Sequence, residues 1–170
     1  MLLGVCADPI QSRSLKEAGF DFVELHVQKH LATLEDETEF NKQLTSIASS
    51  LLPCPVANCF VPGGLKITGD EVDVPALQRY VSTALSRAQK AGMDTIVFGS
   101  GGARRIPDHF DRQRAWQQLV EFGRMVGPIA QKNDITVVVE PLNEKECNVL
   151  TSVGEAGRYV KAVDHPAEQL

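Results

Sequence analysis

The sequence lacks a long apolar run and an excess of basic residues. Its wholly apolar runs are only a few residues long, far short of the ~20 that a helix needs to span a bilayer. The net charge is −5, whereas binding to nucleic acid or to an anionic membrane surface relies on clustered Lys and Arg. Residues 1–7 are apolar but carry no basic region ahead of them, which favours a strand over a signal peptide. We therefore expect no membrane partner and no nucleic-acid partner.

Cysteine is also scarce. The four cysteines, Cys6, Cys54, Cys59 and Cys147, include no CxxC spacing, which argues against a structural zinc site. A disulfide framework is not expected in a chain this long with so much aliphatic residue content. We interpret the four as reduced thiols of a cytoplasmic protein, packed as small buried hydrophobes, with Cys59 as the exception to consider.

Strand-like and helix-like segments alternate along the whole chain. The helix expected near residues 73–92 is the clearest, with Asp73 as its N-cap and Gly92 at its end. No linker interrupts the alternation, so we expect residues 1–170 to form one α/β domain with a parallel sheet. The expected strands are 2–7, 22–27, 55–60, 95–98 and 135–140, and the expected helices are 12–18, 35–50, 73–92, a long helix around Trp116 that ends at Asn133, and a last one from Ser152 to about Val163.

Two architectures are consistent with this pattern. A five-stranded doubly wound sheet fits the chain length. A (β/α)₈ barrel of the TIM type needs ~250 residues, so this chain would correspond to its first five parallel βα units.

The strand at 135–140 ends in a carboxylate. Residues 135–139 are all β-branched, which suits a strand covered on both faces. Pro141 removes a backbone donor and should end the pairing there. Glu140 therefore lies at the carboxyl end of a parallel strand, the end that faces the ligand in α/β folds. That position favours a metal ligand or a general base over a solvated surface charge.

Other polar residues follow strand ends. Asn143 and Glu146 share the loop after Glu140, either as contacts to a polyol substrate or as solvated loop residues. Glu24 and His26 are two residues apart on one strand and so face the same side, either at the mouth of a pocket or as an ion-paired carboxylate and a hydrogen-bonded core histidine.

Two further segments are less specific. Asn58 and Cys59 end the third strand and would form a pocket wall or ordinary packing. Residues 99–105 are rich in glycine and arginine, and could bind an anion through backbone N–H groups or form a flexible loop. They lack the GK[ST] ending of a P-loop and the last glycine of GxGxxG.

The chain resembles the xylose-isomerase-like TIM barrels, in particular sugar epimerases and isomerases of the tagatose 3-epimerase and hydroxypyruvate isomerase type. The resemblance spans nearly the whole chain. It rests on residues 22–25, on 97–101 with Arg104 and Pro107, and most specifically on Val139-Glu140-Pro141-Leu142-Asn143 with Glu146 and Asn148.

This resemblance implies a function. In such families the glutamate that corresponds to Glu140 binds a divalent metal, Mn²⁺ or Mg²⁺ for an oxygen-rich site, and is one of two carboxylates that move a proton beside a carbonyl through an enediolate. Glu146 corresponds to a glutamate that contacts substrate hydroxyls. The remaining ligands, an aspartate, a histidine and a second glutamate, come from strands six to eight, and no residue of this chain can be assigned to them.

We therefore expect a metal-dependent isomerase or epimerase of a sugar or related hydroxy-ketone, inactive as these 170 residues alone. Glu140 would be its metal ligand and catalytic residue, and the substrate would contact Glu146, Asn143, His26, Glu24 and Cys59. One alternative is a truncated barrel that acts as a non-catalytic binding or assembly module, able to form a homo-oligomer through its open sheet edge. A phosphodiesterase like endonuclease IV is a third, less favoured reading, because Asn58-Cys59 and Gly99-Ser100 stand where it would need histidines.

Overall fold

Six parallel strands form one sheet in the computed structural model, which describes all 170 residues. Five of them lie within the predicted segments. The sixth has only two residues, too few to stand out as a pattern in the sequence. The strands are β1 (Gly4–Cys6), β2 (Phe22–His26), β3 (Val56–Asn58), β4 (Thr95–Phe98), β5 (Thr136–Val139) and β6 (Glu168–Gln169).

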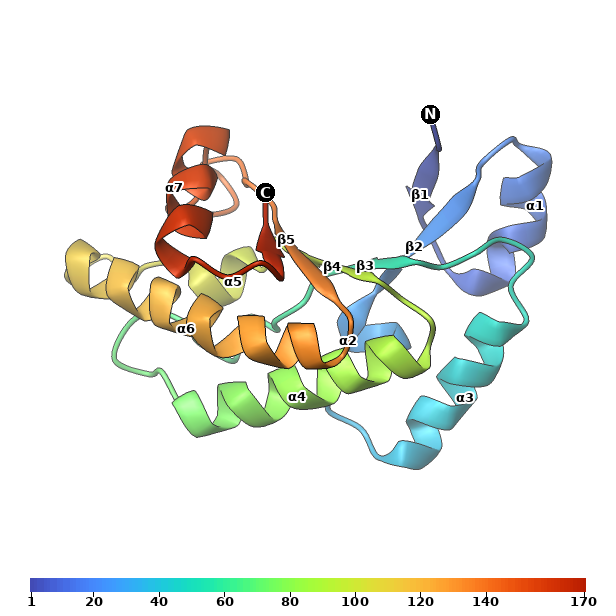
Figure 1. The fold of residues 1–170 in the computed structure, drawn as a ribbon, viewed down its shortest axis with the longest axis horizontal. Coiled ribbons are helices and arrows are strands. Elements are labelled where there is room, and N and C mark those ends of the chain that lie inside the picture. Colours follow the sequence, from blue (N-terminus) through green and yellow to red (C-terminus); the bar gives the residue numbers. More distant parts are fainter.

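Helices fill the connections between the strands (Figure 1). The predicted cap Asp73 is confirmed, because its side chain accepts a hydrogen bond from the N–H of Ala76. Ser152, the predicted start of the last helix, is its N-cap and accepts a hydrogen bond from the N–H of Glu155. Two four-residue helices, α2 and α5, were not predicted. The helical segments are η1 (Pro9–Gln11), α1 (Ser12–Glu17), α2 (Val27–His30), α3 (Glu37–Ala48), α4 (Val74–Lys90), α5 (Gly101–Arg104), α6 (Arg112–Lys132) and α7 (Val153–Val163). None of them has both the length and the apolar character that crossing a membrane requires.

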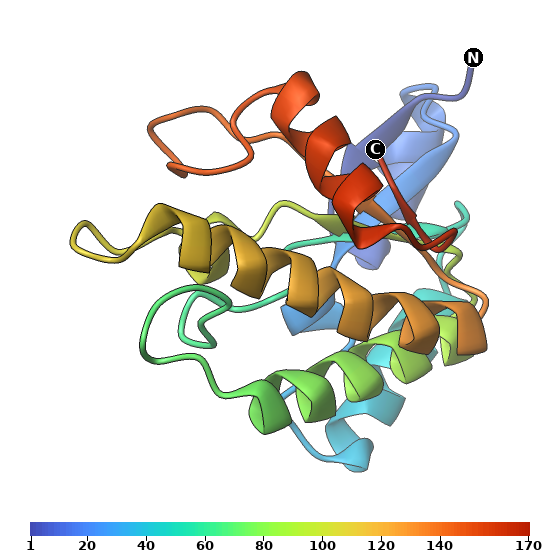
Figure 2. The ribbon, with the colours of Figure 1, turned by 60° about the vertical axis from the view of Figure 1, so that its left-hand side comes forward.

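The sheet is covered by helices on one face only. Along β4 and β5 the burial alternates, so that Phe98 and Val139 are buried while Val97 and Val138 are half-buried. The buried face packs against α4 and α6, which run side by side in both views (Figures 1 and 2). The expectation that strand 135–140 is covered on both faces is therefore wrong for this chain, because only its helix-facing side chains are buried.

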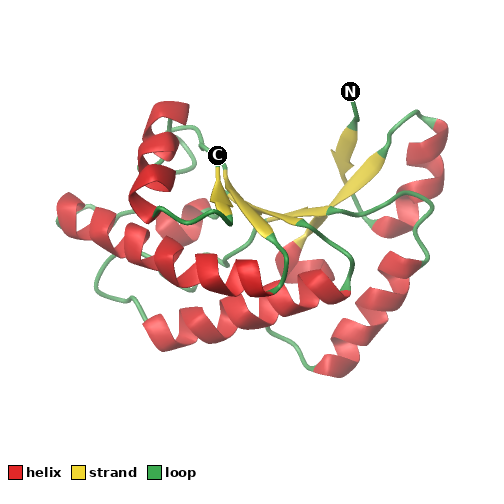
Figure 3. Cartoon of the chain, viewed as in Figure 1, coloured by secondary structure: helices red, strands yellow, loops and turns green.

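Strand order distinguishes the two expected architectures. Each strand pairs only with its neighbours in sequence, in the order β1-β2-β3-β4-β5-β6. A doubly wound sheet reverses its order at a switch point, and this sheet does not. In Figure 3 the strands curve away from the helices, as they do in a (β/α)₈ barrel. The fold is thus of the TIM-barrel type, present here as six strands of an open barrel. We call its uncovered side the concave face.

Candidate active site at the strand ends

Glu140 is the first residue after β5, and its main chain is held on both sides. Its N–H donates to the carbonyl of Phe98 on β4, at 3.2 Å. Its own carbonyl accepts a hydrogen bond from Nη2 of Arg104, at 2.8 Å. The side chain is exposed. The carboxylate is therefore accessible to a ligand while the backbone that carries it is fixed.

Gly99 makes room for that carboxylate. A Cβ atom built on Gly99 would collide with Oε2 of Glu140, and one built on Gly101 would press on Leu142 and on the carbonyl of Glu146. These glycines follow β4, and the residues that they contact follow β5. A side chain at position 99 would therefore displace the Glu140 carboxylate, and one at position 101 would press on the loop after β5.

Two thiols and a second carboxylate lie on or just after the first three strands: Cys6 ends β1, Glu24 is on β2 and Cys59 follows β3. Cys6 on β1 is in register with Glu24 on β2, and Asn58 donates to the sulfur of Cys6 at 3.3 Å. Burial raises the pKa of Cys59, and the negative charges of Glu140 and Glu24 raise it further. Burial and then Glu24 raise the pKa of Cys6. Both thiols therefore stay protonated near neutral pH, as neutral donors to a polar ligand.

His26 ends β2 and is tied to the helix that follows. Its ring Nδ1 accepts a hydrogen bond from the main-chain N–H of Lys29 at 3.4 Å, and its main-chain N–H donates to Nδ1 of His30 at 2.9 Å. Burial lowers the pKa of both histidines. The acceptor role of His26 Nδ1 places the proton of the neutral ring on Nε2, leaving one N–H donor available to a ligand.

Asn143 and Glu146 form a separate pair on the loop after β5. The side-chain amide of Asn143 donates to the Glu146 carboxylate, and the carbonyl of Asn143 accepts the N–H groups of Glu146 and Cys147 at 2.9 and 3.1 Å. Both predicted substrate contacts are exposed. The structure thus groups Glu24, Cys59 and Glu140 electrostatically, and holds Glu146 in place through Asn143.

The segment 99–105 is not the flexible, basic loop that its composition favoured. Ser100 adopts a left-handed conformation (φ 44°) and starts helix α5. Arg104 is completely buried, and its Nη1 and Nη2 donate to main-chain carbonyls while its Nε has no partner. It is therefore not available to bind an anion, and only Arg105 of the two arginines is exposed.

Some residues at the strand ends were not predicted to contribute. Cys6 is exposed and not the buried hydrophobe that was expected, whereas Cys54 and Cys147 are buried as expected. Arg104, which binds the Glu140 carbonyl, entered the sequence analysis through the family resemblance and as part of the segment 99–105, but not as a contact of Glu140. The position of Cys6 at the end of the first strand was a usable signal for it, since the ends of parallel strands meet at one edge of a sheet.

A metal ion would need more ligands than these residues provide. No group of three or more His, Cys, Asp or Glu side chains is arranged to hold a metal. Of the residues placed at the site, Glu140 can contribute one accessible carboxylate. This chain's residues do not by themselves fit a metal centre.

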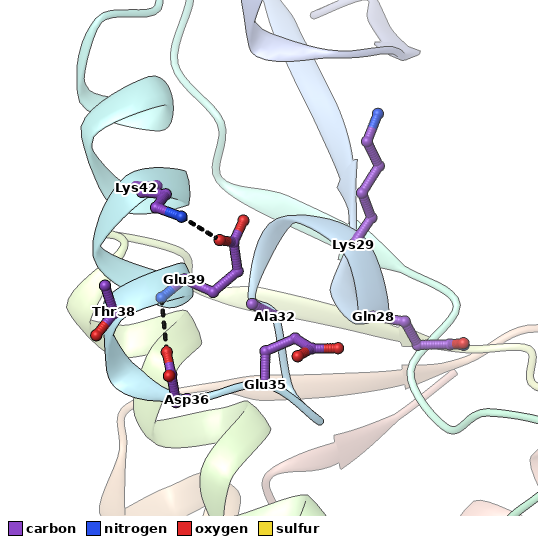
Figure 4. A pocket seen from close by; sticks show the side chains of 8 residues that line it. All are labelled: Gln28, Lys29, Ala32, Glu35, Asp36, Thr38, Glu39 and Lys42. Atoms are coloured by element: carbon purple, nitrogen blue, oxygen red, sulfur yellow. Dashed lines mark hydrogen bonds and ion pairs between the residues drawn. The ribbon is translucent and has the colours of Figure 1, made fainter.

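A large surface groove lies elsewhere. It has a volume of about 580 Å³ and lies between α2 and the start of α3 (Figure 4). Charged and polar side chains line it, among them Glu39, which forms an ion pair with Lys42 at 2.8 Å. None of the predicted site residues lines this groove. The candidate site is on the open concave face, not in a closed pocket.

Comparison with solved structures supports the assignment of the fold. A D-psicose 3-epimerase with D-tagatose from Clostridium cellulolyticum H10 superposes with a TM-score of 0.81 at 18% identity, over 99% of this chain and 62% of that one. An AP endonuclease of family 2 from Brucella melitensis superposes with a TM-score of 0.73 at 22% identity, over 98% of this chain and 66% of that one. The IOLI protein with a bound zinc atom gives 0.68 at 10% identity, over 100% and 62%.

The chain thus spans about two thirds of the length of these similar proteins. No curated protein matches the sequence. A family model, described as the xylose isomerase-like TIM barrel, matches residues 13–169. The match covers nearly all of the strands and helices described above, and the chain therefore belongs to the xylose isomerase-like TIM barrel family.

Proposed function

We propose that this chain forms the part of a sugar or hydroxy-ketone isomerase or epimerase that carries its first catalytic carboxylate, Glu140. The observation that carries the proposal is the placement of Glu140 at the carboxyl end of β5, with a fixed main chain and an accessible carboxylate over Gly99. The likeness to a psicose epimerase with D-tagatose supports this choice of substrate class.

The chemistry that suits this carboxylate is proton transfer next to a carbonyl. Glu140 would take the proton from the carbon beside the carbonyl of a ketose. Neutral donors at the same edge of the sheet, namely His26 and Cys59, would hold substrate hydroxyls, and the half-buried carboxylate of Glu24 and the exposed one of Glu146 would accept hydrogen bonds from others. Asn143 would orient Glu146.

A divalent metal, Mn²⁺ or Mg²⁺, belongs to this proposal only for a complete site. The zinc in the IOLI protein supports metal binding in the family. Because these 170 residues supply a single candidate ligand, we assign no step to a metal here, and we propose that the chain alone does not turn over substrate. Four free cysteines support a reducing, cytoplasmic location as part of the same proposal.

Ligand binding tests the proposal without requiring turnover. Saturation-transfer NMR with D-tagatose should show binding to the native chain and to Glu39→Gln, a control in the groove of Figure 4. Glu140→Ala should abolish it. Equal binding to Glu140→Ala would overturn the role of Glu140.

Turnover separates the enzyme from its alternative. An epimerisation assay with added Mn²⁺ should give no product from the native chain. Product formation that Glu140→Ala abolishes would refute the inactivity of the chain while supporting the chemistry. If the chain binds neither D-tagatose nor Mn²⁺, a non-catalytic binding or assembly module is favoured. That module is the second candidate because no group of three or more potential metal ligands converges in this chain.

A further inference from the structure

We propose that Arg104 is a positioning residue that fixes the main chain of Glu140 and closes the base of the loop that carries Asn143 and Glu146. The side chain is completely buried. It lies on α5, the four-residue helix after β4, and reaches across to the segment after β5. Its effect on ligand binding rests on the proposed role of Glu140, whereas its effect on the backbone does not.

Three carbonyls from three segments accept hydrogen bonds from this one guanidinium. Nη1 donates to Phe98 at the end of β4, at 3.0 Å. Nη2 donates to Glu140 at 2.8 Å and to Leu150 at 3.3 Å. Only arginine offers five donors in a planar fork. Removing them would leave three main-chain acceptors near the site without this partner.

These bonds extend the sheet by one residue. Pairing between β4 and β5 ends with Phe98 opposite Val139. Beyond it, the N–H of Glu140 still donates to Phe98, and the carbonyl of Glu140 is held by Arg104. Both main-chain hydrogen-bonding groups of Glu140 are thus used, so the backbone cannot rotate and redirect the carboxylate without breaking one of them.

The same side chain joins the two ends of the loop 140–150. Leu150 accepts from Arg104 and also from the N–H of Leu142, at 3.1 Å. Asn143 and Glu146 lie between these anchors. Arg104 therefore fixes the separation between Glu140 and the substrate contacts that follow it in sequence.

The charge of Arg104 is buried without a carboxylate in ion-pair contact. Burying an unpaired cation is costly. The three carbonyls offset this cost, as does the ring of Phe98, whose centroid lies 5.4 Å from the guanidinium carbon. An apolar residue of the same size would avoid the cost of burying a charge but could not donate hydrogen bonds to Glu140. The need to hold Glu140 therefore explains an arginine at position 104 better than packing does.

Arg87 provides a matched control. It is the other buried arginine, it also donates to main-chain carbonyls (Leu31, Ala32 and Glu35), and it also covers an aromatic ring, that of Phe40. None of these partners is a residue of the candidate site. Arg87 differs in also pairing with Glu37 at 3.4 Å, but replacing it should likewise break buried hydrogen bonds without changing Glu140.

Amide hydrogen exchange of Glu140, followed by NMR, tests the proposal. In Arg104→Met we expect this amide to exchange about 10- to 100-fold faster, since a buried hydrogen-bond network is broken locally, while amides in the middle of β4 and β5 keep their protection. The exchange rate of the Glu140 amide in Arg104→Lys should lie between those of the native protein and Arg104→Met, because an ammonium cannot reach all three carbonyls. Arg87→Met should leave Glu140 unchanged. If Arg104→Met does not fold, Arg104→Lys decides the question.

Binding of D-tagatose to the same proteins separates the two proposals. Faster exchange of Glu140 together with weakened binding in Arg104→Met, and neither effect in Arg87→Met, supports both. Faster exchange with no D-tagatose binding even to the native chain would overturn the proposed function and leave the role of Arg104 intact. Unchanged exchange at Glu140 in both Arg104 variants would overturn the positioning role, whatever the binding result.

Discussion

The carboxylate of Glu140 occupies the space that a side chain at position 99 would fill. Gly99 does not have a positive φ, so alanine can adopt its backbone conformation without strain. We therefore expect Gly99→Ala to change the free energy of unfolding by less than about 1 kcal/mol but to displace the carboxylate. Affinity for D-tagatose should fall about tenfold, as for the loss of one charge-assisted hydrogen bond.

Gly64→Ala is the control for this variant, because a Cβ atom at Gly64 meets nothing within 4 Å. Titration of D-tagatose followed by NMR compares the two. Equal affinities would show that the Glu140 carboxylate is not held against position 99 in solution.

The stability of the protein should depend on pH through Glu168. Its carboxyl is buried on the helix-covered side with no hydrogen-bond partner, and burial raises its pKa from 4.5 to about 8. The folded protein therefore binds a proton that the unfolded chain releases above pH 4.5. The free energy of unfolding is therefore unaffected by this group below pH 4.5. It falls by about 1.4 kcal/mol per pH unit as the pH rises from there toward 8.

Urea unfolding of the native protein and of Glu168→Gln, from pH 5 to pH 9, checks this expectation. The difference in unfolding free energy between the two should shift in favour of Glu168→Gln as the pH rises. Parallel pH curves would mean that the carboxyl is ionised in the folded state or solvated there.

Tyr80 should matter for stability through its hydroxyl. The hydroxyl donates to the carbonyl of Phe60 at 2.6 Å and accepts from Thr33 at 3.0 Å, and burial raises the pKa of Tyr80 to about 12. Tyr80→Phe leaves a buried acceptor without its donor and should cost about 1–3 kcal/mol. In urea unfolding, Thr33→Val added to Tyr80→Phe should cost less than the sum of the two single changes; strict additivity would contradict the hydrogen-bonded pair.

The concave face should promote self-association, as we propose for this chain. Val97 and Val138 are half-buried there without helices above them, and apolar surface of this kind favours contact between copies. Sedimentation velocity should show a concentration-dependent dimer that Val138→Lys weakens. A monomer at all concentrations would contradict the proposal, and a dimer unaffected by Val138→Lys would place the contact elsewhere.

Much of the fold could be predicted because it depends on local patterns. The strand at 95–98 has its predicted bounds, and the helix between Asp73 and Gly92 has its predicted cap. Helix α5 could not be predicted, since its four residues follow a serine with positive φ, a conformation set by neighbouring loops. Strand β6 could not be predicted, because two residues are too few to show the alternating pattern of a strand.

The candidate site could be predicted only in outline. The ends of parallel strands meet at one edge, so the grouping of Glu24, Cys59 and Glu140 follows from their place in the sequence. The role of Arg104 does not, because its partners are carbonyls whose positions depend on the folded backbone. The burial of Glu168 likewise depends on which side of β6 the helices cover.

The strand order has a consequence for how the chain folds. Since each strand pairs only with the strands next to it in sequence, no pairing has to wait for a distant segment of the chain. The sheet can therefore grow one unit at a time from the N-terminus while the ribosome is still adding residues. Throughout that growth, the last strand formed presents the unpaired edge to which the next must bind.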